Sequence, residues 1–192
     1  MVYDMYSASD LRKGLKIEID GIPYVITEFN FIKPGKGQSL YMCKLRNLIN
    51  GTTLSKTYRA SDKTDAPRLE EKTVRYSYSD GDTYIFLDEN YEHVSISAEV
   101  LGDSRFFLVE DIEVKFLLHN GQPIEVTLPN FVEKKIIHTE TGLRGNTAAN
   151  VLKPATIEGG YKIQVPLFVN NGDIVKIDTR TGEYADRVSK KG

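Results

Sequence analysis

The sequence predicts an all-β protein built from small barrels. Short runs of β-branched and aromatic residues recur along all 192 residues, and Asp-Gly or Asn-Gly pairs separate several of them. This alternation is typical of strands joined by tight turns. Strands this short and this closely spaced favour three small β-barrels in a row, each of about 64 residues, over one or two larger domains.

The first segment, residues 1–65, contains the longest predicted hairpin. Asp20-Gly21 and Asn50-Gly51 mark tight turns on either side of it. Four or five strands within about 60 residues are typical of a small SH3-like barrel, which we predict here. The predicted strands span residues 15–20, 23–33, 38–49 and 53–60.

A loop with one isolated cation connects the two long strands of this hairpin. Pro34 presets φ for a turn, and Gly35 and Gly37 permit positive φ on either side of Lys36. No acidic residue lies within seven positions of Lys36. Arms of about ten residues at about 3.3 Å each would carry this lysine about 30 Å from the opposite turn. The loop is therefore either an ordinary turn with a solvated lysine or a device that presents one positive charge.

The second segment, residues 66–129, begins in a stretch rich in turn formers and charge at residues 61–69, which we interpret as a linker. Five strands and one short helical turn at residues 97–101 fit an OB-type barrel. Tyr76 and Tyr78 lie two residues apart, hence on one face, where they either stack on bases or pack against protein. The predicted strands span residues 73–78, 83–87, 106–109, 112–118 and 124–128.

The third segment, residues 130–192, has two features that suit contact with RNA. Its loop at residues 142–150 holds two glycines, small polar residues and an arginine, so its backbone can approach a ribose-phosphate chain. Near the C-terminus, Tyr184 and Arg187 follow a turn, and both residue types suit RNA backbone contacts. The alternatives are a plain surface loop and two edge-strand residues. The loop candidates are Arg144, Gly145, Asn146 and Thr147, and the predicted strands span residues 132–138, 163–169 and 174–178.

The net charge of −2 and the pI near 6.0 conceal an uneven distribution. Residues 1–64 carry 10 Lys/Arg and 6 Asp/Glu, residues 65–128 carry 5 and 14, and residues 129–192 carry 10 and 7. Because phosphate contacts are electrostatic, we expect the two basic ends to touch RNA and the acidic middle to face elsewhere. The alternative is an uneven charge distribution without function.

The sequence predicts a cytoplasmic protein. Charges begin at Asp4, and no apolar run approaches the roughly 18 residues that a membrane helix needs, so we expect neither a signal peptide nor a membrane association. The single Cys43 allows no internal disulfide, which suits a reducing compartment.

No pattern in the sequence predicts catalysis or a metal site. The three histidines are scattered, and there is neither a Cys-x-x-Cys pair nor a Gly-x-Ser-x-Gly elbow. The acidic pairs Asp88-Glu89 and Glu110-Asp111 flank predicted strands, and we interpret them as solvated. We therefore expect no enzymatic activity, no catalytic residues, no metal and no cofactor.

Motifs spread over nearly the whole chain resemble those of bacterial elongation factor P. As a combination they are highly specific. The motifs are Asp20-Gly21-x-Pro23-Tyr24, Lys33-Pro34-Gly35-Lys36-Gly37-Gln38, Lys44-Leu45-Arg46, Asn120-Gly121-Gln122-Pro123-Ile124, Leu128-Pro129-Asn130-Phe131-Val132-Glu133, Lys153-Pro154-Ala155-Thr156, Val165-Pro166-Leu167-Phe168-Val169 and Asp178-Thr179-Arg180-Thr181-Gly182-Glu183-Tyr184-x-x-Arg187.

The resemblance implies a fold and a function. The fold is an SH3-like or KOW-like barrel followed by two OB-fold barrels, arranged in an L shape like that of tRNA. The function is that of a non-enzymatic elongation factor, which binds the ribosome beside peptidyl-tRNA, stimulates peptide-bond formation and relieves stalling at consecutive prolines. A monomer fits a tRNA-sized shape.

The resemblance also implies roles for particular residues. It places Lys36 near the CCA end of peptidyl-tRNA, where it carries a β-lysyl group added by an enzyme resembling lysyl-tRNA synthetase. It places Tyr184 and Arg187 on peptidyl-tRNA and the loop at residues 142–150 near messenger RNA in the exit site. This sequence has Asn146 where the family usually has Asp, a change that removes one negative charge.

A general single-stranded RNA- or DNA-binding protein with OB-fold barrels is the alternative function. Such a protein is expected to interleave aromatic and basic residues along one face of each barrel. The acidic middle segment and the isolation of Lys36 favour the elongation factor.

Overall fold

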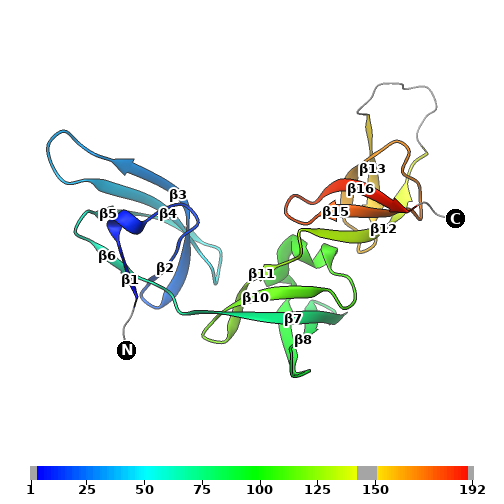
Figure 1. Cartoon of the computed structure of the whole chain (residues 1–192), viewed down its shortest axis with the longest axis horizontal. Coiled ribbons are helices and arrows are strands. Elements are labelled where there is room, and N and C mark those ends of the chain that lie inside the picture. Colours follow the sequence, from blue (N-terminus) through cyan, green and yellow to red (C-terminus); the bar gives the residue numbers. More distant parts are fainter. Residues whose placement is uncertain (1–3, 142–150, 190–192) are drawn as a thin grey trace. The chain divides into compact units, whose positions relative to one another are not determined.

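The computed structural model describes residues 4–141 and 151–189 and consists almost entirely of strands in three sheets (Figure 1). The predicted all-β fold class is therefore confirmed. Residues 1–71 and 117–125 form one compact unit, and residues 72–116 and 126–192 form the other. None of the helices in the described ranges has the length and apolar character needed to cross a membrane.

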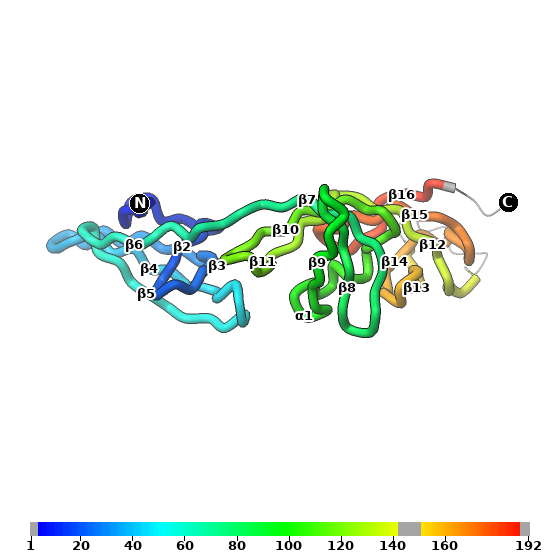
Figure 2. The backbone as a smooth tube through the Cα atoms, turned by 90° about the horizontal axis from the view of Figure 1, so that it is seen from below, coloured from blue at the N-terminus to red at the C-terminus, as the bar shows by residue number. Residues whose placement is uncertain are grey.

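The first sheet has six strands and lies in the first unit. They are β1 (Met5–Ser7), β2 (Lys16–Ile19), β3 (Ile22–Ile32), β4 (Leu40–Asn47), β5 (Thr53–Arg59) and β6 (Lys63–Asp65), with a 3-10 helix at Ala8–Asp10. Their order across the sheet is β1-β6-β2-β3-β4-β5. Figures 1 and 2 show the light-blue hairpin of β3 and β4 extending past the rest of its own barrel.

The second sheet has five strands in the order β11-β10-β7-β8-β9. They are β7 (Leu69–Asp80), β8 (Thr83–Leu87), β9 (His93–Ser97), β10 (Glu113–His119) and β11 (Gln122–Thr127), and α1 (Ala98–Leu101) with a 3-10 helix at Gly102–Phe107 follows β9. Ser97 caps α1, because its side chain accepts a hydrogen bond from the backbone N–H of Val100. The helical turn expected at residues 97–101 is therefore present.

The third sheet also has five strands, in the order β14-β13-β12-β15-β16. They are β12 (Phe131–Thr139), β13 (Leu152–Ile157), β14 (Lys162–Pro166), β15 (Ile174–Asp178) and β16 (Glu183–Ser189). The three sheets follow the predicted order of three barrels, and the boundaries after residues 65 and 129 stay a prediction.

Two predictions of secondary structure are wrong. The linker predicted at residues 61–69 contains β6, which pairs with β1 from Met5↔Asp65 to Ser7↔Lys63. The strand predicted at residues 106–109 is instead the end of a 3-10 helix followed by extended chain. Its apolar residues Phe107 and Leu108 are buried all the same, because a short apolar run fits a buried helical turn as well as a strand.

Each sheet buries an apolar face of its own. In the second sheet the rings of Phe86 and Phe116 meet edge to face, with centroids 4.8 Å apart. Removing one such side chain from water contributes about 2–3 kcal/mol to stability. The side chains that are less than 2% exposed include Ile17, Ile26, Leu45, Val74, Phe86, Val114, Phe116, Ile136, Ile157, Val165, Val169 and Ile177.

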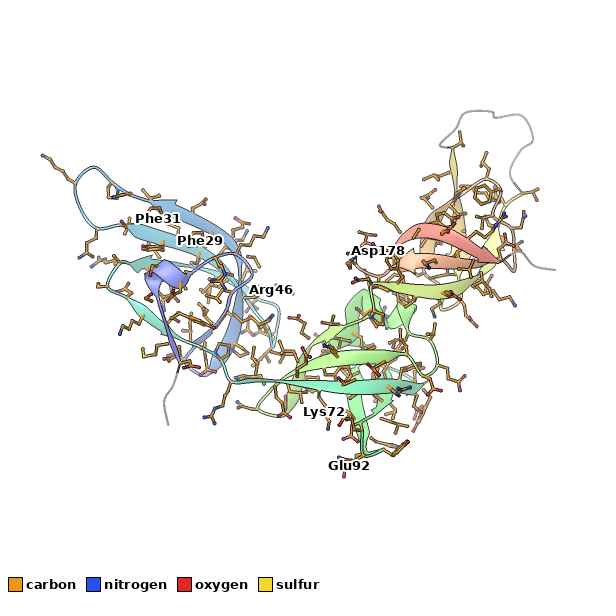
Figure 3. The ribbon with its side chains drawn as sticks, viewed as in Figure 1. Phe29, Phe31, Arg46, Lys72, Glu92 and Asp178 are labelled. Atoms are coloured by element: carbon orange, nitrogen blue, oxygen red, sulfur yellow. The ribbon has the colours of Figure 1, made fainter. Side chains whose placement is uncertain are left out.

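Asp88, predicted to be solvated, is buried in a turn of the second barrel. Its carboxylate lies 2.8 Å from the ammonium of Lys72 and accepts hydrogen bonds of 2.9 Å from the backbone N–H groups of Asn90 and Glu92. The Lys72 ammonium and these backbone donors lower the pKa of Asp88. Figure 3 labels Lys72, which lies on β7, and Glu92, the last residue of this turn before β9. Asp88 therefore stabilises the turn between β8 and β9, which is a structural role.

Candidate functional site

A β-bulge in β3 decides which side chains line the long hairpin. Before the bulge, Ile26 pairs with Leu45 on the core face, and after it Glu28 pairs with Lys44. Thr27 is the extra residue, and its hydroxyl donates a 3.1 Å hydrogen bond to the Lys44 carbonyl. The bulge reverses the phase of the strand, so odd-numbered residues face the core side beyond it.

Aromatic rings continue the core along this face of the hairpin. Phe31 and Tyr41 have centroids 4.9 Å apart, and Phe29 lies 6.3 Å from Tyr41 (Figure 3). On the opposite face, Lys44 and Glu28 form an ion pair of 3.0 Å. Cross-strand aromatic pairs stabilise β3 against β4, and β5 pairs with the other edge of β4 from Leu40↔Arg59 to Arg46↔Thr53. The strands that lead to the tip are therefore supported on both faces, and Phe29 and Tyr41 pack against the core of the first barrel.

The tip of the hairpin presents Lys36 to solvent. Lys36 is exposed, and within the described ranges it makes no ion pair or hydrogen bond. Gly37 has φ +115°, as predicted, whereas Gly35 does not have positive φ, so that part of the prediction is wrong. The half-buried Pro34 lies 3.8 Å from where a Cβ at Gly37 would stand. The tip therefore displays the charge of Lys36, without an internal partner among the described residues, on a compact turn.

The predicted loop site lies outside the described residues. Arg144, Gly145, Asn146 and Thr147 all fall in the range 142–150.

Arg187 and Tyr184 lie on β16, at the edge of the third sheet, and both are partly buried. The Arg187 guanidinium lies over the ring of Phe168, 4.6 Å from its centroid, and 3.6 Å from the buried carboxylate of Asp173. Burial, followed by the carboxylate of Asp186, raises the pKa of the Tyr184 phenol. Arg187 is thus held in place by groups that sequence reasoning missed.

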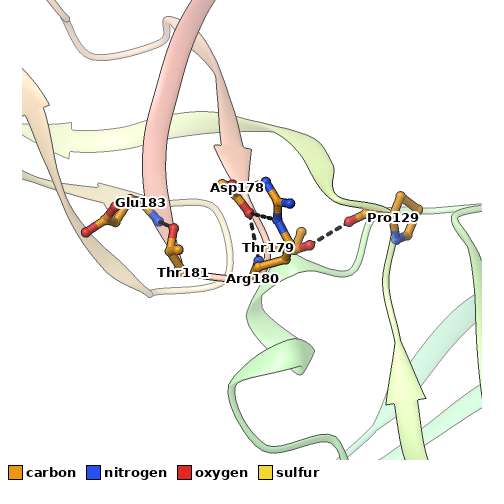
Figure 4. A network of polar contacts seen from close by, with 6 residues as sticks. All are labelled: Pro129, Asp178, Thr179, Arg180, Thr181 and Glu183. Carbon is orange, nitrogen blue, oxygen red and sulfur yellow. Dashed lines mark hydrogen bonds and ion pairs between the residues drawn. The ribbon is translucent and has the colours of Figure 1, made fainter.

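A polar network fixes the turn between β15 and β16 (Figure 4). Arg180 pairs with Asp178 through two hydrogen bonds of 2.9 and 2.6 Å, and the guanidinium lowers the pKa of the Asp178 carboxyl. Thr179 donates from its hydroxyl to the Pro129 carbonyl at 2.5 Å and from its backbone N–H to the Asn130 carbonyl at 2.9 Å. The turn therefore anchors the segment that leads into β12.

Within the second unit, the second and third sheets share a packed contact. The ring of Tyr161 lies against the rings of Phe106 and Phe107, with centroids 5.4 and 5.1 Å away. The buried Lys134 donates a 2.5 Å hydrogen bond to the Leu108 carbonyl, and burial lowers the pKa of its ammonium. This contact fixes the third barrel against the second.

The described residues give no support for a metal site. They contain no group of three or more His, Cys, Asp or Glu side chains placed to hold an ion. Among the histidines, His119 lies in the first unit with its ring nitrogen 3.2 Å from the Glu18 carboxylate. A second ion pair, between Lys16 and Glu125 at 3.4 Å, lies in the same unit. These groups make structural contacts.

Three protein-family models match consecutive parts of the chain. The KOW-like domain of elongation factor P matches residues 7–64, its OB domain matches residues 69–126, and its C-terminal domain matches residues 132–187.

Similar proteins cover nearly the full chain. "Elongation factor P" of Desulfotalea psychrophila is 49% identical over 187 residues, which are 97% of this chain and 100% of that protein. "Elongation factor P 2" of Geobacter sulfurreducens is 44% identical over 96% of this chain and 99% of its own. Among solved structures, eukaryotic translation initiation factor 5A from Methanococcus jannaschii matches with a TM-score of 0.54 and 20% identity, over 66% of this chain and 92% of that one. That structure supports the fold.

Proposed function

The chain belongs to the elongation factor P family, and from this premise we propose that it binds the ribosome beside peptidyl-tRNA and stimulates peptide-bond formation at consecutive prolines. Members of this family are translation factors and not enzymes, so the chain is a translation elongation factor without catalytic chemistry of its own. The alternative of a general single-stranded nucleic-acid binder is not favoured, because all three matched domains are those of one translation factor.

The observation that carries the proposal is the uncompensated Lys36 at the end of the supported hairpin. An ammonium that makes no internal ion pair among the described residues keeps its donors for ribose and phosphate oxygens. The aromatic pairs of Phe29, Phe31 and Tyr41 restrict bending of the strands that carry it. In the proposed complex this hairpin places Lys36 beside the CCA end of peptidyl-tRNA.

The proposed mechanism is entropic. Proline is a hindered secondary amine with φ fixed by its ring, so consecutive prolines are expected to fit poorly in the ribosome's catalytic centre. A cation that binds the CCA end restricts peptidyl-tRNA to its reactive pose and lowers the entropic part of the barrier. The ribosome performs the bond formation, and this chain supplies position and charge.

We place the remaining RNA contacts on the third barrel. Tyr184 and Arg187 would bind the peptidyl-tRNA backbone, and the loop at residues 142–150 would lie near messenger RNA in the exit site, with Arg144 on a phosphate. In this proposal the factor is a cytoplasmic monomer.

The test of the proposed function is the rate of peptide-bond formation through three consecutive prolines. Purified ribosomes are assayed with and without the protein isolated from its native host, and we expect the protein to raise the rate about tenfold or more. A template with alanines in place of the prolines is the control and should show little change. If the proline rate does not rise while the protein binds single-stranded RNA, the general binder replaces the elongation factor.

We also propose that Lys36 carries a β-lysyl group, added by an enzyme resembling lysyl-tRNA synthetase. The site suits such an adduct, because Lys36 is exposed and a Cβ at Gly35 would meet nothing within 4 Å. The adduct would lengthen the reach and add cationic donors. Mass spectrometry of protein from the native host should find one extra lysyl residue on the peptide that contains Lys36 and none on the peptide that contains Lys56. An unmodified Lys36 peptide would contradict this.

A further inference from the structure

Phe168 is a large aromatic side chain on the surface of the third barrel. It is 54% exposed, although the Arg187 guanidinium covers one side of its ring at 4.6 Å from the centroid. The exposed area therefore belongs to the face and edge that the guanidinium leaves uncovered. An aromatic ring that has a cation over one face and more than half of its surface exposed can serve as a stacking platform.

The backbone beneath this ring is fixed. The Phe168 carbonyl accepts hydrogen bonds of 3.2 Å from both Arg187 and the side chain of Asn170. The next residue, Val169, is fully buried, and its N–H donates to the Pro166 carbonyl at 3.1 Å. The ring is therefore presented from an ordered turn, so little entropy is lost when a partner stacks on it.

The guanidinium is fixed as well. The buried Asp173 carboxylate lies 3.6 Å from Arg187 and also accepts a 3.0 Å hydrogen bond from the Asn170 backbone N–H. The Arg187 side chain is 21% exposed, so Phe168 offers more free surface than the arginine beside it. Arg187 therefore has two effects: it restricts the orientation of the Phe168 ring, and it places a positive charge beside that ring.

We propose that Phe168 stacks on a nucleotide of peptidyl-tRNA and that Arg187 and Asp173 are positioning residues for it. The inference rests on the proposed function, which supplies the RNA partner. Base stacking suits the uncovered ring face, and the adjacent guanidinium suits the neighbouring phosphate. A protein partner would use the apolar ring without need of the charge.

The exposed Phe131 of the same barrel provides a contrast. It is 46% exposed but lies opposite Asp178 in the register between β12 and β15. The nearest guanidinium, that of Arg180, is paired with Asp178 through two hydrogen bonds. That guanidinium lies 5.7 Å and the Lys176 ammonium 5.8 Å from the Phe131 ring centroid, so neither cation covers this ring as closely as Arg187 covers that of Phe168. Phe131 therefore serves as a control for an exposed ring at another position of the same barrel.

The first test uses the absence of tryptophan from the chain. A Phe168→Trp variant carrying 7-azatryptophan, which is excited at longer wavelength than ribosomal tryptophan, is mixed with ribosomes that hold peptidyl-tRNA. We expect its fluorescence to change on binding, and that of a Phe131→Trp variant to stay constant. If co-sedimentation shows the Phe168→Trp variant bound and its fluorescence is unchanged, the stacking proposal is wrong. If the unsubstituted protein fails to co-sediment, the proposed function itself fails.

The second test separates stacking from folding. Phe168→Leu should weaken ribosome binding about tenfold while the salt dependence of binding and the melting temperature stay unchanged, and Phe168→Tyr should restore affinity. Arg187→Gln should reduce the salt slope by about one. Equal affinity of Phe168→Leu and unsubstituted protein would overturn the proposal.

A third test identifies the partner. A photo-crosslinker in place of Phe168 should label tRNA, and labelling of a ribosomal protein would also overturn the proposal.

Discussion

Replacing Lys36 by alanine is expected to reduce the stimulated rate of elongation through three prolines about tenfold or more, which corresponds to about 1.4 kcal/mol of activation free energy. The side chain is exposed and has no internal partner among the described residues, so its removal leaves the hairpin intact. In the proposed complex, only the charge beside the CCA end is lost. The measurement is the single-round rate of tripeptide formation on purified ribosomes at saturating factor.

The control for this prediction is Lys33→Ala. Lys33 is also exposed, in the same loop, but precedes Pro34 and is not at the centre of the turn. Its replacement removes one charge of the same kind, and we expect the rate to fall less than about threefold. An equal loss in both variants would indicate that the loop acts by general charge attraction. A Lys36→Ala variant with full activity would contradict the proposed role of the tip.

Replacing Gly182 by alanine is expected to destabilise the protein by about 3 kcal/mol. Gly182 has φ +75°, which costs an alanine about 1 kcal/mol. Its new Cβ would stand 2.9 Å from the hydroxyl of Tyr161 and 3.5 Å from the Phe107 ring. Because Tyr161 is packed against Phe106 and Phe107, it has little room to move, and overpacking adds about 1–3 kcal/mol. Urea denaturation measures the free energy of unfolding.

Gly160 gives a matched control, because it lies in the same barrel with φ +89° and no atom stands within 4 Å of the position that a Cβ would take there. Gly160→Ala therefore carries the backbone cost alone, about 1 kcal/mol. The difference between the two variants measures the contact with Tyr161. If both variants lose equal stability, the contact between Gly182 and Tyr161 does not constrain this packing.

Local sequence was sufficient for most of the fold. The pairs Asp20-Gly21 and Asn120-Gly121 correctly predicted the positions of two hairpin turns. Both residues of each pair have positive φ, which few other residue types tolerate. The prediction of a strand at residues 106–109 failed, because a buried helical turn and a buried strand can have the same short run of apolar residues. The bulge at Thr27 left no local signal, because it appears only when β3 pairs with β4.

Some residues of the candidate site could be predicted from local sequence, and others could not. Lys36 could be predicted from its neighbours Pro34 and Gly37, because the tip of a hairpin is a local structure. Phe168 is not, because its importance depends on Arg187, which is 19 residues away, and on Asp173 beneath the guanidinium. An exposed phenylalanine is indistinguishable from a core residue until its environment is known.

The bulge in β3 has a consequence for how the length of this hairpin can vary. Side chains in a strand alternate with a period of two, so lengthening or shortening both arms by two residues keeps Phe31 beside Tyr41 on one face and moves the tip by about 7 Å. Inserting or deleting one residue in β3 alone would move its aromatic side chains to the opposite face, where Glu28 and Lys44 form their ion pair. The length of the hairpin can therefore change only in steps of two residues if its two faces are to be kept. The bulge at Thr27 determines which residues of β3 lie on the aromatic face.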